Sequence, residues 1–116
     1  NSRWIIDPID GTSNFIHAIP YFCISVALEQ HNEIVAGVIY DPIHNELFTA
    51  EKGKGAFVND RKLVVSSRNS VEDAMLVTGK AARSSAQDKA MYHLATTLSA
   101  SGAIVRYFGA TALDLA

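Results

Sequence analysis

The sequence predicts a mixed chain of the α+β or α/β class, with an antiparallel sheet in its first half and a β-α-β-α segment in its second. Residues 21–30 alternate large apolar residues with small or polar ones, which is the period of a β-strand. Residues 84–101 instead carry an apolar stripe at helical spacing, between two strand-like runs. Because residues 66–70 form a polar connector between the two patterns, we expect subdomains at 1–67 and 68–116. Only the first part of the second subdomain is expected within this chain.

In the first half, the aromatic and β-branched residues Trp4, Ile5 and Ile6 predict a buried strand. Pro8 can neither donate to a ladder nor extend a helix, so we expect this strand to stop near Asp7. One or two helical turns should follow. A meander of antiparallel strands is then predicted, with turns between them, at residues 21–30, 34–40, 46–51, 56–58 and 61–63. The run at 34–40 is apolar on both faces and is expected to be central.

In the second half, strand-like runs at 74–78 and 104–108 flank the helical pattern at 84–101, and Gly102 marks the end of that helix. Gly109 then turns the chain toward a further helix near Ala110. This β-α-β-α order predicts a parallel pair of strands joined by a right-handed crossover.

The composition excludes a disordered or fibrous protein. The chain has 116 residues, 48% of them hydrophobic, and a net charge of -2, as in an ordinary globular protein without general attraction to nucleic acid or anionic membranes. We therefore expect a soluble, cytoplasmic protein. The single cysteine, Cys23, is expected to be a buried free thiol. The chain begins without Met and ends at Ala116 inside a helical run, which suggests a central piece of a longer protein.

The stretch at residues 4–15 carries the clearest chemistry, because an apolar run leads directly into Asp7, Asp10, Gly11 and Thr12. Two carboxylates offer the oxygen ligands that Mg²⁺ prefers, and a helix start at Thr12 would suit an anion. A plain turn explains Asp, Pro and Gly equally well. A calcium-binding EF-hand loop is excluded, since its third and fifth positions would be Ile9 and Gly11.

Residues 7–15 read Asp-Pro-Ile-Asp-Gly-Thr-Ser-Asn-Phe and closely resemble the first signature of the inositol monophosphatase family. The match extends to the Trp-Ile-Ile before the signature and to His17 and Pro20 after it. The resemblance implies a layered αβαβα sugar-phosphatase fold, of which this chain would be a fragment. It also implies a Mg²⁺-dependent, lithium-sensitive hydrolase that acts on a small phosphorylated substrate and forms a homodimer.

By the same resemblance, each residue of the signature has a role. Asp7 would bridge two metal ions, and Ile9 would supply its backbone carbonyl as a metal ligand. Asp10 would bind both metal and substrate, and Gly11 and Thr12 would meet the phosphate and the attacking water.

A second stretch repeats this layout, because the predicted strand at 104–108 ends in Gly109, Ala110 and Thr111 before a helix. The resemblance implies that these three residues contact the alcohol portion of the substrate. A plain strand-to-helix turn explains them equally well.

Members of the family carry further acidic ligands, in an upstream Gly-Glu-Glu-like motif and a downstream Trp-Asp motif, that these 116 residues lack. We therefore expect the isolated chain to bind Mg²⁺ poorly. The substrate stays open between inositol monophosphate, which is favoured, and fructose bisphosphate, adenosine bisphosphate or histidinol phosphate. A regulatory binding protein that keeps the fold, as some bacterial relatives do with transcription machinery, is the alternative from another class.

The histidines and the basic residues of the chain do not indicate a second metal or phosphate site. The four histidines fall on unrelated predicted elements, which makes a histidine metal site improbable. The basic stretch at 52–68 is typical of solvated hairpin loops, and Gly53-Lys54-Gly55 lacks the spacing of a phosphate-binding P-loop.

Overall fold

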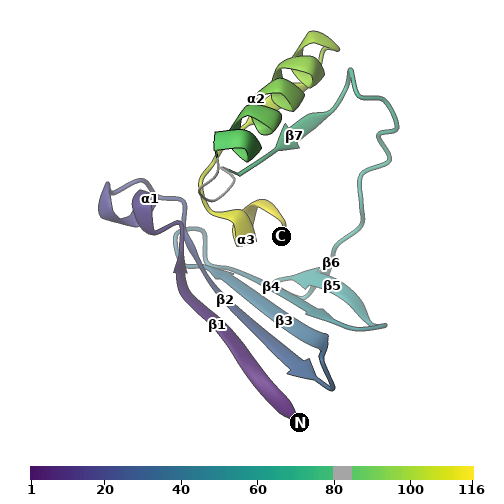
Figure 1. Cartoon of the computed structure of the whole chain (residues 1–116). Helices are drawn as coiled ribbons and strands as arrows, with labels where there is room; N and C mark the ends of the chain where they lie inside the picture. The colour runs from purple at the N-terminus through teal and green to yellow at the C-terminus, as the bar shows by residue number, and fades with distance from the viewer. Residues whose placement is uncertain (80–84) are drawn as a thin grey trace. The chain divides into compact units, whose positions relative to one another are not determined.

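The computed structural model describes residues 1–79 and 85–116, with the side chains of residues 85–88 left out. The chain divides into two compact units (Figure 1). One comprises Asn1–Val65 together with Ala110–Ala116, and the other comprises Ser66–Gly109. Within the described residues, no helix is long and apolar enough to cross a membrane.

The first unit is built on a six-stranded sheet whose strands follow one another in chain order, each antiparallel to the next. This confirms the predicted meander, and the apolar run at 34–40 does form an interior strand. The strands are β1 (Ser2–Asp10), β2 (Cys23–Gln30), β3 (Glu33–Asp41), β4 (Glu46–Glu51), β5 (Gly55–Val58) and β6 (Arg61–Lys62).

The prediction that the first strand stops near Asp7 is wrong, because β1 continues through Pro8 to Asp10. Its regular register runs to the pair Asp7 and Ser25, breaks at a bulge, and resumes where Asp10 pairs with Cys23. Pro8 is tolerated since β1 is an edge strand and the proline falls within the bulge, where no ladder hydrogen bond is required of it.

The prediction that Trp4, Ile5 and Ile6 are buried is also wrong for this chain. Their exposed fractions are 65%, 44% and 61%. Strand β1 has a neighbouring strand on one side only, so apolar character alone did not decide burial.

Two short helices belong to the first unit. Helix α1 (Thr12–Ile16) follows β1 directly, with Gly11 in the left-handed conformation before it. The start at Thr12 was expected. Helix α3 (Thr111–Asp114) contacts β1, β2 and β3, so a segment from the far end of the sequence packs against the sheet.

The second unit contains β7 (Met75–Val77), α2 (Ser85–Ala100) and β8 (Ile104–Arg106). The two strands pair in parallel, as predicted, while the handedness of their connection stays a prediction. Residue 84, where the helix was expected to begin, lies outside the described residues. Apolar side chains of the helix stripe face the strands across a cavity lined by Leu76, Val77, Thr78, Met91, Leu94, Ala95, Leu98 and Val105.

Candidate active site

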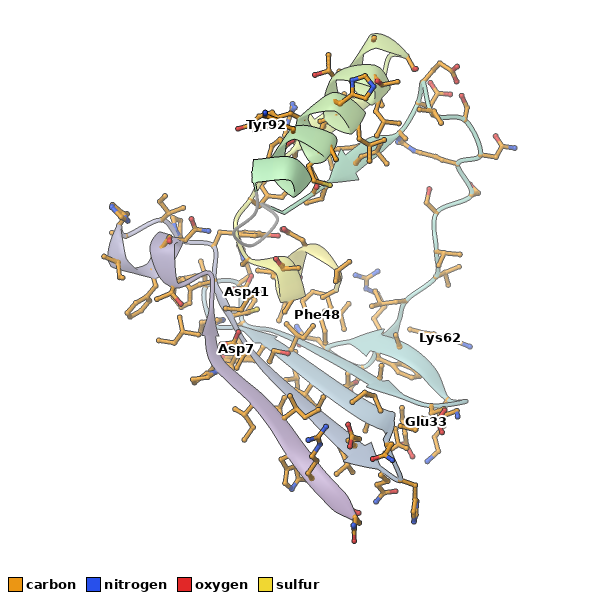
Figure 2. The ribbon with its side chains drawn as sticks, viewed as in Figure 1. Asp7, Glu33, Asp41, Phe48, Lys62 and Tyr92 are labelled. Carbon is orange, nitrogen blue, oxygen red and sulfur yellow. The ribbon has the colours of Figure 1, made fainter. Side chains whose placement is uncertain are left out.

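Three aspartates of the first unit, Asp7, Asp10 and Asp41, lie at one end of its sheet. Strand β1 ends at Asp10 and β3 ends at Asp41, and because both are antiparallel to β2, these ends lie on either side of the start of β2 at Cys23. Figure 2 shows Asp7 and Asp41 at this end and Glu33 at the other. Helix α3 lies at the same end (Figure 1).

The stretch from Asp7 to Thr12 is held by local hydrogen bonds. The backbone N–H of Ile9 donates to Oδ1 of Asp7 at 3.2 Å, and the Thr12 hydroxyl donates to the Ile9 carbonyl at 2.9 Å. The first bond closes an Asx turn, in which an Asp side chain accepts the backbone N–H of the residue two positions later. Asp7 and Thr12 are exposed, whereas Ile9 and Asp10 are half-buried.

Asp10 is tied to helix α3 by a long-range contact. The backbone N–H of Ala112 donates to Oδ2 of Asp10 at 2.6 Å, across 102 positions of sequence. Helix α3 has no side-chain cap of its own. The Asp10 carboxylate therefore satisfies one of the amides that a helix start leaves unpaired.

Cys23 lies against the same carboxylate, with its Sγ 4.0 Å from Oδ2 of Asp10. The side chain is fully buried and free, as predicted. Burial first, and then the negative charge of Asp10, raise the pKa of the Cys23 thiol to about 11. This thiol is therefore protonated near neutral pH and acts as a weak donor rather than as a nucleophile.

Gly11 joins the first predicted segment to the second. It is buried at φ 86°, and a Cβ added there would lie 3.0 Å from Cβ of Ala110, 3.1 Å from the Tyr21 carbonyl oxygen and 3.2 Å from Cα of Phe22. The backbone thus requires glycine both for its conformation and for the close approach.

The predicted substrate-contact segment divides between the two units. Ala110 is fully buried in the first unit, beside Gly11, and Thr111 is exposed at the start of α3. Gly109 takes φ 90° and is the last residue of the second unit, so the structure places it with that unit.

Tyr21 and Asp114 were not predicted as site residues. The Tyr21 hydroxyl donates to Oδ1 of Asp114 at 2.7 Å, across 93 positions of sequence. Burial, followed by the hydrogen bond to Asp114, raises the pKa of Tyr21, which keeps the phenol a donor. No local pattern could have indicated this pair, since each residue on its own resembles an ordinary loop or helix residue.

The donor atoms at this end of the sheet are of the kind that hold magnesium. Asp7, Asp10 and the Ile9 carbonyl offer only oxygen, and oxygen ligands suit Mg²⁺ rather than zinc or copper. Among residues 1–79 and 85–116, no group of three or more His, Cys, Asp or Glu side chains could hold a metal ion. Since protein-bound Mg²⁺ commonly uses one or two carboxylates and keeps several waters, the residues fit in kind as part of a ligand set.

Comparison with known proteins identifies relatives of this chain. The family model described as "Inositol monophosphatase family" matches residues 1–116. An inositol-1-monophosphatase of Caulobacter vibrioides is 46% identical over 115 residues, covering 97% of this chain and 45% of that protein. A protein of Xylella fastidiosa named Nus factor SuhB is 42% identical over 113 residues, covering 97% of this chain and 41% of that protein.

Among solved structures, the extragenic suppressor protein SuhB of Bartonella henselae superposes with a TM-score of 0.91 at 47% identity. The match covers 98% of this chain and 44% of that one. This match confirms the predicted fold class, and the chain makes up a fragment of the complete fold. The chain spans less than half the length of each of these three proteins.

Proposed function

Because the chain belongs to the inositol monophosphatase family, we propose that the full-length protein is a Mg²⁺-dependent hydrolase of a small phosphate monoester. Two features of the structure support this reaction. The chain presents Asp7, the Ile9 carbonyl and Asp10 in one hydrogen-bonded stretch, and it packs the start of α3 against that stretch through Gly11.

In this proposal, Asp7, Asp10 and the Ile9 carbonyl hold the metal. When bound, Mg²⁺ would neutralise charge on the phosphate and lower the pKa of a coordinated water. The protein supplies positioning. Thr12, fixed by its bond to the Ile9 carbonyl, would orient the attacking water, and Gly11 would let the phosphate approach the backbone.

The remaining predicted residues would recognise the alcohol portion of the substrate. We propose that Gly109, Ala110 and Thr111 contact it, and that residues 1–67 and 68–116 belong to two subdomains of the full-length protein. The name of the Caulobacter vibrioides relative favours inositol monophosphate as the substrate. Fructose bisphosphate, adenosine bisphosphate and histidinol phosphate remain the alternatives to be compared.

The decisive variant is Asp10→Asn in the full-length protein. An asparagine can still accept the bond from the Ala112 amide through its side-chain oxygen, so the change removes the charge while it preserves the contact with α3. Phosphate release should be measured with inositol monophosphate and with the three alternative compounds. With the compound that the parent protein hydrolyses, release should depend on Mg²⁺, be inhibited by Li⁺, and fall by at least about 100-fold in this variant.

The matched control is Asp60→Asn, which changes an exposed carboxylate in the turn between β5 and β6. This variant should retain full activity. Equal activity of the Asp10→Asn and parent proteins would contradict the proposed metal site, provided that both unfold at the same temperature.

A regulatory binding role is the second candidate, and the relative named Nus factor SuhB favours it. This role is compatible with hydrolysis. If the Asp10→Asn protein restores a cellular phenotype that deletion removes, binding rather than catalysis carries that phenotype. We also propose a homodimer, which sedimentation of the full-length protein would test.

A further inference from the structure

A short helix carries the contact between the predicted active-site stretch and the far end of the sequence. Helix α3 has four residues, Thr111–Asp114, and it is closed by a bond from the Asp114 N–H to the Ala110 carbonyl at 2.9 Å. A helix of one turn has no stability of its own, so its position depends on tertiary contacts.

Two hydrogen bonds of the first unit supply such contacts, one near each end of the helix. Near the start, the Ala112 N–H binds Oδ2 of Asp10 at 2.6 Å. At the end, Oδ1 of Asp114 accepts the Tyr21 hydroxyl at 2.7 Å. Loss of the second bond would remove a contact that holds the C-terminal end of the helix to the first unit.

Tyr21 is itself held firmly by the end of the signature and by the residues that follow it. Its carbonyl accepts the side-chain amide of Asn14 at 2.8 Å, and its N–H donates to the Ile19 carbonyl at 2.8 Å. The next residue, Phe22, packs edge to face on Phe15 with ring centroids 5.0 Å apart. The phenol therefore presents a fixed donor to α3.

The Asp114 carboxylate is poorly suited to a purely structural role. Its Oδ2 is buried and has no hydrogen-bond partner in the part of the chain that the structure describes. A buried oxygen without a partner costs free energy, which an apolar side chain at the same place would avoid. A group retained at such a cost is a candidate for a functional task.

We propose that Tyr21 and Asp114 are positioning residues for Asp10. Their bond fixes α3, and the Ala112 amide of α3 then holds Oδ2 of Asp10. The Asp10 carboxylate is therefore oriented before the metal ion and substrate bind. The inference rests on the proposed function, since it assigns Asp10 the role of metal and substrate ligand.

The test compares two tyrosine variants of the full-length protein. Tyr21→Phe removes only the hydroxyl that binds Asp114. Tyr40→Phe removes a hydroxyl that makes a similar 2.9 Å bond to Asn45 in the turn between β3 and β4, and serves as the matched control. Loss of a group that hydrogen-bonds a metal ligand commonly weakens metal binding or activity by about 10- to 100-fold. Tyr21 acts on such a group, the Ala112 amide, through α3, so its loss should have an effect at the lower end of this range.

We therefore expect Tyr21→Phe to weaken Mg²⁺ binding, measured by calorimetry, by roughly tenfold and to lower kcat more than it raises KM. Tyr40→Phe should change neither. Asp114→Asn should stay near the parent values because its amide oxygen can still accept the phenol, whereas Asp114→Ala should match Tyr21→Phe. Mg²⁺ affinity and kcat of Tyr21→Phe within twofold of the parent would overturn the proposal.

A structural readout separates this proposal from the proposed function. The Ala112 amide proton should lose hydrogen-exchange protection in Tyr21→Phe and keep it in Tyr40→Phe. If the parent protein hydrolyses no phosphate monoester, the proposed function fails, and this measurement still decides whether Tyr21 positions Asp10. An unchanged Ala112 amide in Tyr21→Phe would exclude positioning by this route.

Discussion

Oδ2 of Asp10 accepts the backbone N–H of Ala112 at 2.6 Å, although 102 positions of sequence separate the two residues. The carboxylate that the sequence singles out as a metal and substrate ligand is thus also the cap of a helix start. The bond joins two segments that were predicted separately, and it makes the geometry of Asp10 depend on how α3 packs.

Gly11 is expected to tolerate no side chain. Gly11→Ala would combine the strain of a left-handed alanine, about 1–2 kcal/mol, with overpacking against Ala110 and Tyr21, about 1–3 kcal/mol more. Gly53→Ala is the control, since Gly53 has φ 79° and nothing within 4 Å of an added Cβ. Urea unfolding should show a larger loss of stability for Gly11→Ala, and equal losses would mean that the close approach is relieved without cost.

The buried carboxylate of Asp41 is expected to make the turn after β3 sensitive to pH. Burial alone would raise the pKa of Asp41, but bonds from the His44 ring at 2.7 Å and from the N–H groups of His44 and Ile43 lower it overall. The bond to Asp41, the charge of Asp41 and, more weakly, that of Glu46 raise the pKa of His44 above its ordinary value of 6.5.

The signs of these two shifts define a pH window. The contribution of Asp41 is present above its ordinary pKa of 3.8 and is lost as pH falls through the lowered value. The contribution of His44 is fully present below 6.5 and is lost as pH rises through the raised value. NMR titration should give His44 a pKa above 6.5 in the parent and a lower one in Asp41→Asn. Asp60→Asn should leave the His44 titration unchanged.

Cys23 is expected to resist alkylation while the protein is folded. The rise of its pKa from 9.0 to about 11 reduces the thiolate fraction at pH 8 by roughly 100-fold, and full burial blocks access as well. Iodoacetamide should therefore modify Cys23 at the rate of unfolding or local opening. Mass spectrometry of the parent and of Cys23→Ala would isolate its reaction, and rapid modification of folded protein would contradict the burial of this side chain.

The thiol should also affect stability at high pH. Because the folded pKa of Cys23 is raised, its protonated form is favoured in the folded state, and this contribution is fully present below 9.0. Stability should then fall as pH rises from 9 toward 11, and Cys23→Ala should show a weaker fall.

The sequence by itself determined the order and type of the elements. Alternation with a period of two is visible in residues 21–30, and the helical stripe containing Met91 and Leu98 is visible in the same way, because backbone geometry imposes these periods locally. The motif at Asp7 to Thr12 was also readable, since those residues are adjacent in the chain. Pro8 misled the prediction of where β1 ends, because edge position and a bulge are properties of the sheet rather than of the residue.

Only the tertiary structure decided what Asp10 and Gly11 touch. The Ala112 amide and the Ala110 methyl group reach this stretch, and Tyr21 binds Asp114, because α3 packs against the sheet end that carries the stretch. Contacts across about a hundred positions leave no local period in the sequence, since each partner satisfies only the packing of the folded chain. The sequence therefore determined which groups stand at the end of β1, and packing decided how Asp10 is held.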